Sequence, residues 1–331
     1  MSVVTFGRIG LGLGVVLGAL AGAVPAGAGE GAAVALLERA REAAAMETFA
    51  GLVVVEWHDG RRSRRSEVPV QSAAGVFRFG DEVVGSGARR LVRGPDGWLT
   101  LWRHDVVALG PSPAAKYDLS VAPGPVVAGR ATEVVEVRVA SGTAAVERLY
   151  VDGDSGLILG RELLDARGRP YRSLRFVSLS AGAPAALATP ARSEVEAPVE
   201  AGRVNAPYRA PATLGNGYRL VGTYEKPHHV LHLFYSDGLH GLSVFEQRGH
   251  LSASAMPAGG RRVELDGRSV RTWSTPAGET VVWESDGVVY TVVSDASRAD
   301  VAAAVGDLPH SQRAKRVRRV AEVVVSLFRW R

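Results

Sequence analysis

The chain has 331 residues, 46% of them hydrophobic and 22% charged, a composition that excludes a disordered or fibrous protein and allows one large or two modest domains. Because cysteine is absent, thiol catalysis, disulfide bonds, Cys-ligated zinc and iron–sulfur clusters are excluded. Basic residues outnumber acidic ones by 39 to 34, and the net charge of +5 suggests nucleic acid or a membrane surface as a partner.

Residues 1–28 have the pattern of a secretory signal peptide. Arg8 precedes an uncharged, mostly apolar run, and Ala26-Gly27-Ala28 places small residues where signal peptidase cleaves. The alternative is an uncleaved membrane anchor, because the run is about long enough to span a bilayer. Its many glycines disfavour a stable helix and favour cleavage after Ala28. Both interpretations predict an extracytoplasmic location, in the periplasm or cell-envelope space, and no later apolar run predicts a second membrane segment.

The next part of the chain, residues 29–180, predicts one helix followed by many strands. Apolar residues recur at helical spacing over 33–47, with charged residues on the other side. Short β-branched and aromatic segments separated by Gly and Asp turns follow, and without helices between them they predict antiparallel pairing in an open or closed barrel. The predicted strands are 52–57, 76–79, 89–92, 98–102, 133–139, 147–151, 157–164 and 172–179.

A second strand-rich region follows a change in composition. Residues 181–213 are rich in alanine, contain five prolines and show no apolar periodicity, which predicts a linker between two domains. Residues 214–308 predict a smaller antiparallel domain with a short helix at 298–306, so the fold class is mainly β (α+β). Its predicted strands are 218–224, 230–235, 242–246, 261–265, 269–273, 280–284 and 288–293.

A hydrolytic site is disfavoured. Ser236, Asp237 and His240 supply the residue types of a triad, but they fall in one short segment, whereas triad members are normally assembled by the fold. No Gly-x-Ser-x-Gly nucleophile elbow and no Gly-rich phosphate loop are present. We therefore predict no catalytic residues and no enzymatic activity.

Metal binding is the second chemistry that the sequence raises. Four of the eight histidines, His228, His229, His232 and His240, fall within thirteen residues, and four imidazoles can hold zinc. No carboxylate lies at a recognisable ligand spacing and no HExxH helix is present. We favour a structural interpretation with His232 paired in a sheet and the others solvated, and we predict no metal and no cofactor.

Three aspartates lie in the turns of the first domain. Asp152, Asp154 and Asp165 stand in glycine-containing segments, Asp152-Gly153-Asp154-Ser155-Gly156 and Asp165-Ala166-Arg167-Gly168, between predicted strands. Aspartate side chains in such turns accept hydrogen bonds from their own backbone. We interpret all three as turn formers and not as paired catalytic carboxylates.

Five segments between residues 36 and 246 occur in a recognisable order. They read LLERAREAAAMETFAGLVVV, VAGRATEVVEV, LYVDGDSGLILGRELLDARGRPYRSLRF, GYRLVG and LHLFYSDGLHGLSVF. In this order they resemble the RseB/MucB family of extracytoplasmic regulators of envelope-stress sigma factors. The tetrapeptide Ser236-Asp237-Gly238-Leu239 is the most recognisable match. Beyond Phe245 the match weakens, so partner contacts of the C-terminal domain do not carry over.

The resemblance implies both a fold and a function. The N-terminal domain would be a curved antiparallel half-barrel like LolA-type lipoprotein carriers, closed by helices around an apolar cavity. The protein would bind the extracytoplasmic part of a membrane-bound anti-sigma factor, shield it from proteolysis and so restrain an ECF sigma factor, with release by lipid or lipoprotein. The alternative is an extracytoplasmic lipid or lipoprotein carrier that uses the same cavity.

The resemblance also directs attention to two sets of site residues. Ser236, Asp237, Gly238 and Leu239 are the predicted partner-binding motif. Apolar residues of the first domain are predicted to line the lipid cavity, although the same residues would equally form an ordinary core. These are Leu52, Val54, Trp57, Phe77, Phe79, Leu99, Leu101 and Leu149.

The excess of basic charge lies in the C-terminal tail. Residues 309–331 hold seven basic residues and one acidic residue, so the rest of the chain is close to neutral and a nucleic-acid partner is not predicted. Apolar residues recur there at helical spacing, which predicts an amphipathic helix on an anionic membrane surface through Arg316, Arg319, Phe328 and Trp330. A solvated tail, or a helix packed on the second domain, is the alternative.

Overall fold

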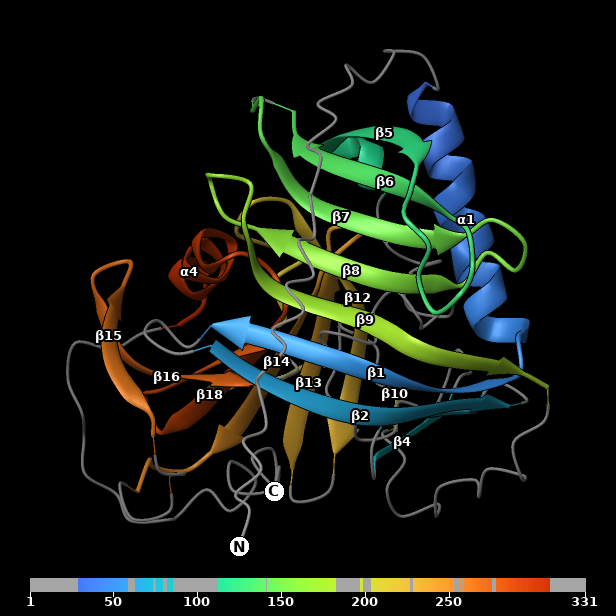
Figure 1. The fold of residues 1–331 in the computed structure, drawn as a ribbon. Coiled ribbons are helices and arrows are strands. Elements are labelled where there is room, and N and C mark those ends of the chain that lie inside the picture. Colours follow the sequence, from blue (N-terminus) through green and yellow to red (C-terminus); the bar gives the residue numbers. More distant parts are fainter. Residues whose placement is uncertain are drawn as a thin grey trace, which may run out of the picture.

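The protein is described by a computed structural model of residues 29–58, 63–73, 76–79, 82–85, 112–140, 142–182, 197–198, 204–226, 229–252, 256, 259–275 and 278–309. These residues form two units, each built on one antiparallel sheet, and the second sheet lies behind the first in the view of Figure 1. The signal segment, the basic tail and the predicted strands at 89–92 and 98–102 lie outside the described residues. No helix in the described ranges is long and apolar enough to cross a membrane.

The N-terminal unit begins with a helix and continues as a nine-stranded sheet of order β4-β3-β2-β1-β9-β8-β7-β6-β5. Strand β1 pairs with β9, so the first and last strands of this unit lie side by side near the middle of the sheet. The elements are α1 (Glu30–Met46), β1 (Phe49–His58), β2 (Ser63–Ala73), β3 (Val76–Phe79), β4 (Glu82–Gly85), η2 (Pro113–Ala115), β5 (Tyr117–Pro123), β6 (Thr132–Val139), β7 (Ala145–Asp152), β8 (Ile158–Leu164) and β9 (Pro170–Ala181).

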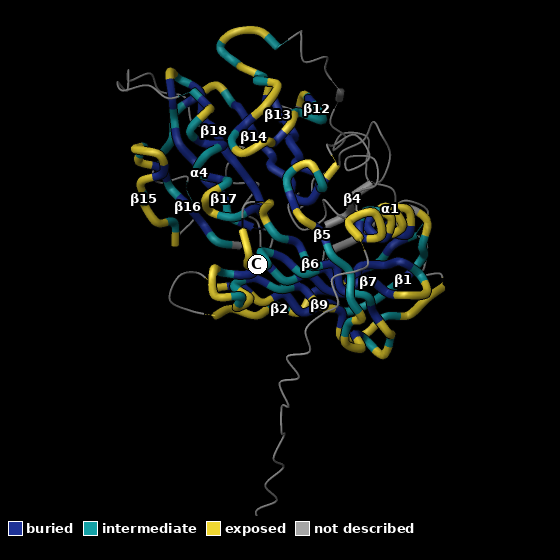
Figure 2. The backbone as a smooth tube through the Cα atoms, turned by 90° about the horizontal axis from the view of Figure 1, so that it is seen from above, coloured by how far each residue is buried: buried dark blue, intermediate teal, exposed yellow. Residues whose placement is uncertain are grey.

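Helix α1 crosses one face of this sheet (Figure 1), and its apolar spacing explains which side it buries. Ala33, Leu36, Leu37 and Ala40 follow the helical repeat and pack against β5, β6 and β7, where Leu149 is fully buried. Figure 2 shows exposed residues along the outer side of α1 and buried residues along the central strands of both sheets. The helix predicted over 33–47 is therefore confirmed, with a start three residues earlier.

The C-terminal unit is a second antiparallel sheet with one helix. Its main path is β10-β12-β13-β14-β18-β17-β16-β15, and β11 pairs with β12. A separate core forms between this sheet and α4, with Tyr235, Val244 and Tyr290 from the sheet and Val301 and Ala304 from the helix. The elements are β10 (Ala197–Pro198), β11 (Thr213–Leu214), β12 (Tyr218–Lys226), β13 (Val230–Ser236), β14 (Gly241–Arg248), β15 (Arg261–Leu265), β16 (Arg268–Thr275), β17 (Gly278–Ser285), β18 (Val288–Ser294) and α4 (Arg298–Asp307).

The predicted mainly β class with antiparallel sheets is confirmed. Every strand predicted after residue 214 exists, with ends shifted by two residues at most. The strand β2 was not predicted, because its first half reads Ser-Arg-Arg-Ser-Glu and only Val68, Val70 and Ser72 show the buried alternation. Strand β5 was also missed, because Asp118 and Ser120 interrupt a short apolar pattern.

Candidate functional site

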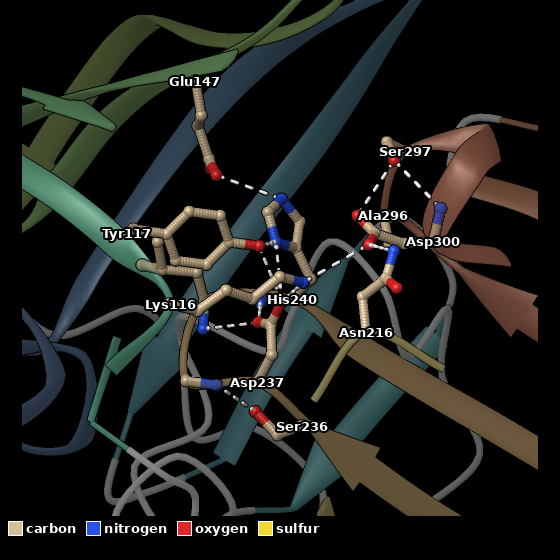
Figure 3. A network of polar contacts seen from close by, with 12 residues as sticks. Lys116, Tyr117, Glu147, Asn216, Ser236, Asp237, His240, Ala296, Ser297 and Asp300 are labelled. Carbon is tan, nitrogen blue, oxygen red and sulfur yellow. Dashed lines mark hydrogen bonds and ion pairs between the residues drawn. The ribbon is translucent and has the colours of Figure 1, made fainter. Parts of the chain in front are cut away.

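Charged side chains of both units meet at the turn between β13 and β14 (Figure 3). The turn is shaped by its own residues. The Asp237 Oδ1 atom accepts hydrogen bonds from the backbone N–H groups of Leu239 at 3.1 Å and His240 at 2.8 Å, and Ser236 Oγ accepts from Gly238 N at 3.0 Å. Gly238 has a φ of +96°, a conformation that other residues rarely adopt. This local chemistry makes a compact turn, and the side chains of Asp237 and Leu239 are directed at the N-terminal unit.

Asp237 is the centre of the contact between the units. Its Oδ2 atom accepts from Lys116 Nζ at 2.6 Å and from the Tyr117 hydroxyl at 2.7 Å, although Asp237 is only 2% exposed. The backbone oxygen of Gly238 accepts from an Arg41 guanidinium nitrogen on α1 at 2.9 Å. The turn is thus held by α1, by the residue before β5 and by the first residue of β5.

Leu239 supplies the apolar part of the same contact. Its side chain is fully buried among residues of α1, β5, β6, β7 and β8, including Leu36, Leu37 and Leu149. A buried leucine contributes about 1.5–3 kcal/mol by leaving water. One residue of the C-terminal unit therefore occupies an apolar site that belongs to the N-terminal unit.

A second group of ion pairs lies beside the first. The His240 Nε2 atom is 3.1 Å from Glu147 Oε2 on β7, and the Tyr117 hydroxyl is 3.2 Å from His240 Nδ1. Glu147 Oε1 accepts from Arg161 on β8, and Arg161 also donates to Asp295, which follows β18. We call Lys116, Tyr117, Glu147, Arg161, Asp237, His240 and Asp295 the interdomain cluster.

The electrostatics of this cluster keep its histidine charged. Burial by itself lowers the pKa of His240, but the Glu147 and Asp237 carboxylates outweigh burial and raise the pKa to about 10. Burial opposes ionisation of Asp237, yet His240 and Lys116 hold the pKa of that carboxyl well below its usual range. Burial and the neighbouring Asp237 raise the pKa of the Tyr117 hydroxyl, so it remains a hydrogen-bond donor.

Helix α4 is tied to the same region through its first turn. Ser297 caps the helix by accepting from Asp300 N at 3.1 Å, and its hydroxyl donates to Asp300 Oδ2 at 2.9 Å. The other oxygen, Asp300 Oδ1, accepts from Asn216 at 3.0 Å and lies 3.4 Å from Lys116 Nζ. Lys116 therefore bridges two carboxylates of the C-terminal unit (Figure 3).

This arrangement differs from that of a hydrolytic triad. Ser236 Oγ accepts from the backbone, while both ring nitrogens of His240 face acidic groups or Tyr117. A histidine that is held protonated does not take a proton from a serine hydroxyl. Within the described ranges, no group of three His, Asp or Glu side chains is arranged to hold a metal ion. The contacts of the cluster instead connect side chains of the two units.

The four predicted motif residues, Ser236, Asp237, Gly238 and Leu239, all lie at this turn. Asp237, Gly238 and Leu239 contact the N-terminal unit, while Ser236 Oγ accepts from Gly238 N within the turn. The prediction that His240 is solvated was wrong, because the turn carries it into the cluster, where it is 5% exposed. His232 is paired in the sheet as predicted, 3.0 Å from Ser243 Oγ and stacked on Phe245.

The residues predicted to line a lipid cavity lie on two faces of the first sheet. Side chains of directly paired antiparallel residues point to the same face of a sheet. Leu149 pairs with Arg161, Arg161 with Leu174, and Leu174 with Val55, so Leu149 and Val55 share one face. Trp57 lies two residues after Val55 on β1 and points to that face as well. Leu52 and Val54 point to the opposite face because they alternate with Val55. Phe77 and Phe79 lie on β3, Leu99 and Leu101 lie outside the described residues, and so do the tail residues Arg316, Arg319, Phe328 and Trp330.

Two of the turn aspartates behave as predicted. Asp152 Oδ2 accepts from Ser155 N at 3.2 Å and from Arg130 at 2.7 Å, and Asp165 Oδ1 accepts from the backbone of Arg167 at 2.9 Å. These contacts hold the turns on either side of β8.

Five members of the cluster were not identified from the sequence: Lys116, Tyr117, Glu147, Arg161 and Asp295. One sequence signal was present. Glu147 is spaced by two residues from Leu149 and by four from Val151 along β7, so it shares their face and a charge stands at a position that faces the core. A buried charge requires a partner, and this requirement points to a contact beyond the strand itself.

No protein-family model matches the chain, and no curated protein matches it. Among solved structures, MucB in complex with MucA(peri) is similar at 22% identity and a TM-score of 0.45, over 84% of this chain and 99% of that one. A chain of the Pseudomonas aeruginosa MucA/MucB complex is similar at 23% identity and a TM-score of 0.44, over 82% of this chain and 96% of that one. A LolA superfamily protein from Nitrosomonas europaea is similar at 10% identity and a TM-score of 0.20, over 79% and 90%.

Proposed function

We propose that this protein is an extracytoplasmic regulator that binds the extracytoplasmic segment of a membrane-bound anti-sigma factor and thereby restrains an envelope-stress sigma factor. The proposal rests on the ordered set of segments that resemble the RseB/MucB family. One structural observation gives the proposal its strongest support. The most recognisable of these segments, residues 236–239, is the turn that joins the two units, with Leu239 and Asp237 buried against the N-terminal unit.

This position gives the motif a physical role in partner binding. A binding surface that spans two units exists only while the units keep one mutual arrangement. The interdomain cluster favours one arrangement, because buried ion pairs demand specific geometry even where they add little net stability. We infer that the partner segment binds across both units in the arrangement that residues 236–241 hold.

Release of the partner by lipid or lipoprotein is also part of the proposal, and it has a thermodynamic condition. An acyl ligand releases the partner only if it binds the free protein more tightly than the complex. The signal segment, by delivering the chain outside the cytoplasmic membrane, would place it where both an anti-sigma factor and mislocalised lipoproteins occur. The C-terminal tail would add contact with an anionic membrane surface.

The test is made in the organism that carries the gene. Deleting the gene should raise transcription that depends on one envelope-stress sigma factor, and the wild-type gene should restore repression. Crosslinking of the tagged, full-length protein should capture a single-pass membrane protein with a cytoplasmic sigma-binding region. The variant Asp237→Asn should restore repression poorly, while Asp154→Asn, a matched change at an exposed turn, should restore it fully. Unchanged transcription in the deletion strain would overturn the proposal.

A further inference from the structure

The turn at residues 236–241 is the best candidate for a moving part, because the two units are otherwise separate in their cores. One core of the N-terminal unit contains only residues of that unit, such as Val55 and Phe176, and the core around α4 contains only residues of the C-terminal unit, such as Tyr290. Among the buried apolar clusters, the one beneath α1 joins residues of both units, and Leu239 is the member that the C-terminal unit contributes.

Around Leu239 the contact is polar. Arg41 donates to Gly238 O, Lys116 and Tyr117 donate to Asp237, and His240 pairs with Glu147. Beside this group, the buried Arg161 pairs with the buried Asp295. The hydration that buried charges lose offsets most of the Coulomb attraction between them. Such pairs therefore specify one arrangement of the units but contribute little to the free energy that keeps the units together. Inter-unit contacts of this polar kind permit relative motion of the units.

We propose that residues 236–241 form a releasable latch: the turn acts as an intramolecular ligand of the N-terminal unit, and its withdrawal separates the two units and uncovers an aliphatic binding site beneath α1. In the closed state Leu239 occupies this site, which is formed by Leu36, Leu37, Leu149 and neighbouring apolar residues. In the open state both cores stay intact, because neither depends on Leu239. The inference rests on the proposed function only for the statement that the closed state binds the partner.

The latch predicts which changes open the molecule. Glu147→Gln leaves His240 without its partner on β7 and removes one of the two carboxylates that pair with Arg161. His240→Gln leaves Glu147 and Asp237 without their shared cation. The double variant Glu147→Gln/His240→Gln removes one charge of each sign, so it should recover much of the closed population. Arg41→Gln is a milder change that removes one hydrogen bond and no buried ion pair.

The test is a distance measurement between the units in the full chain. Because the protein has no cysteine, Asp154→Cys on an exposed turn of the N-terminal unit and Glu264→Cys at an exposed position of β15 place one spin label on each unit without competing thiols. Double electron–electron resonance should give one narrow distance distribution in the labelled parent. A second, longer distance should be the major one in Glu147→Gln and His240→Gln and a minor one in Arg41→Gln. The double variant should shift back toward the parent.

Two controls make the result decisive. Glu136→Gln breaks partly buried ion pairs within the N-terminal unit, with Arg148 at 3.0 Å and with Arg138, and should leave the distance between the units unchanged. Leu239→Ala removes the seated side chain without touching any charge and should lengthen the distance, with a rise in fluorescence of the apolar probe 1-anilinonaphthalene-8-sulfonate. Parent-like distances in Glu147→Gln, His240→Gln and Leu239→Ala together would overturn the latch.

The distance measurement tests the latch and the capture experiment tests the proposed function, so either can be contradicted without the other. If the distances respond as expected but no anti-sigma factor is captured, the latch stands and the proposed function does not. If the anti-sigma factor is captured but the distances do not respond, the proposed function stands and the latch does not.

Discussion

Lys116 Nζ and Asp237 Oδ2 lie 2.6 Å apart although 121 positions separate the two residues in the sequence. The pair joins the residue before β5 to the turn after β13, and Asp237 is almost completely buried. Because each residue belongs to a different unit, this contact couples the stability of the turn to the arrangement of the whole molecule.

Replacing Asp237 with asparagine should destabilise the protein by about 3–5 kcal/mol, the usual effect of breaking a buried ion pair. Asparagine keeps an oxygen to accept from the N–H groups of Leu239 and His240, so the turn itself persists. The asparagine variant loses the negatively charged Oδ2 atom, which pairs with Lys116 and accepts the hydrogen bond from Tyr117. Urea unfolding measures the change. Asp154→Asn should stay within about 0.5 kcal/mol of the parent, and an equally small effect at Asp237 would contradict the expectation.

The raised pKa of His240 predicts that the free energy of unfolding falls at alkaline pH. Its pKa rises from 6.5 to about 10 on folding, so its contribution is fully present below pH 6.5 and is lost as the pH rises toward 10. The maximal slope for one proton is about 1.4 kcal/mol per pH unit. Unfolding free energies at several pH values from 6 to 10 should show this decline in the parent and a flatter profile in His240→Gln. Parallel profiles would exclude His240 as the titrating group.

The raised pKa of Glu246 predicts a second pH range, on the acidic side of neutrality, in which the free energy of unfolding changes. Glu246 is fully buried on β14, and burial raises its pKa from 4.5 to about 7, although its Oε2 accepts from Arg209 N at 3.0 Å. The carboxyl therefore contributes stability below pH 4.5 that is lost as the pH rises through 7. Glu246→Gln keeps an acceptor for Arg209 and should be about 1–3 kcal/mol more stable than the parent at pH 8.

The measurement for Glu246 is urea unfolding at pH 5 and pH 8. The advantage of the glutamine variant should be much smaller at pH 5, because the parent is then largely protonated. The exposed Glu264→Gln variant should show no such difference between the two pH values. A glutamine variant that is less stable than the parent at pH 8 would show that the ionised carboxyl is better accommodated than its burial implies.

Leu149 should behave as a packed core residue. It is fully buried among Leu36, Leu37 and Leu239, so Leu149→Ala should cost about 2–5 kcal/mol through lost burial and the space left behind. Met46, 81% exposed at the end of α1, provides the control, and Met46→Ala should change stability by less than about 0.5 kcal/mol. A neutral Leu149→Ala would instead indicate a loosely filled space suited to a ligand.

The sequence by itself determined the elements whose pattern is local. The buried spacing of Leu36, Leu37 and Ala40 identified α1. Strands of the second sheet such as β13 and β18 were found because each is a short, mostly apolar run, and both are buried throughout. Asp152 and Asp165 were identified as turn formers because their partners lie within a few positions of the sequence. Such patterns record which face of a segment leaves water, and that is a property of the segment itself.

Only the tertiary structure decided which charges meet. The polar strand β2 was missed because its pairing with β1, and not its own composition, makes it a strand. His240 was expected in solvent because no residue near it in the sequence reveals Glu147, which lies 3.1 Å away in space but on another unit. Burial of a charge depends on a partner of opposite sign, and the fold alone brings distant partners within the few ångströms over which that attraction offsets lost hydration.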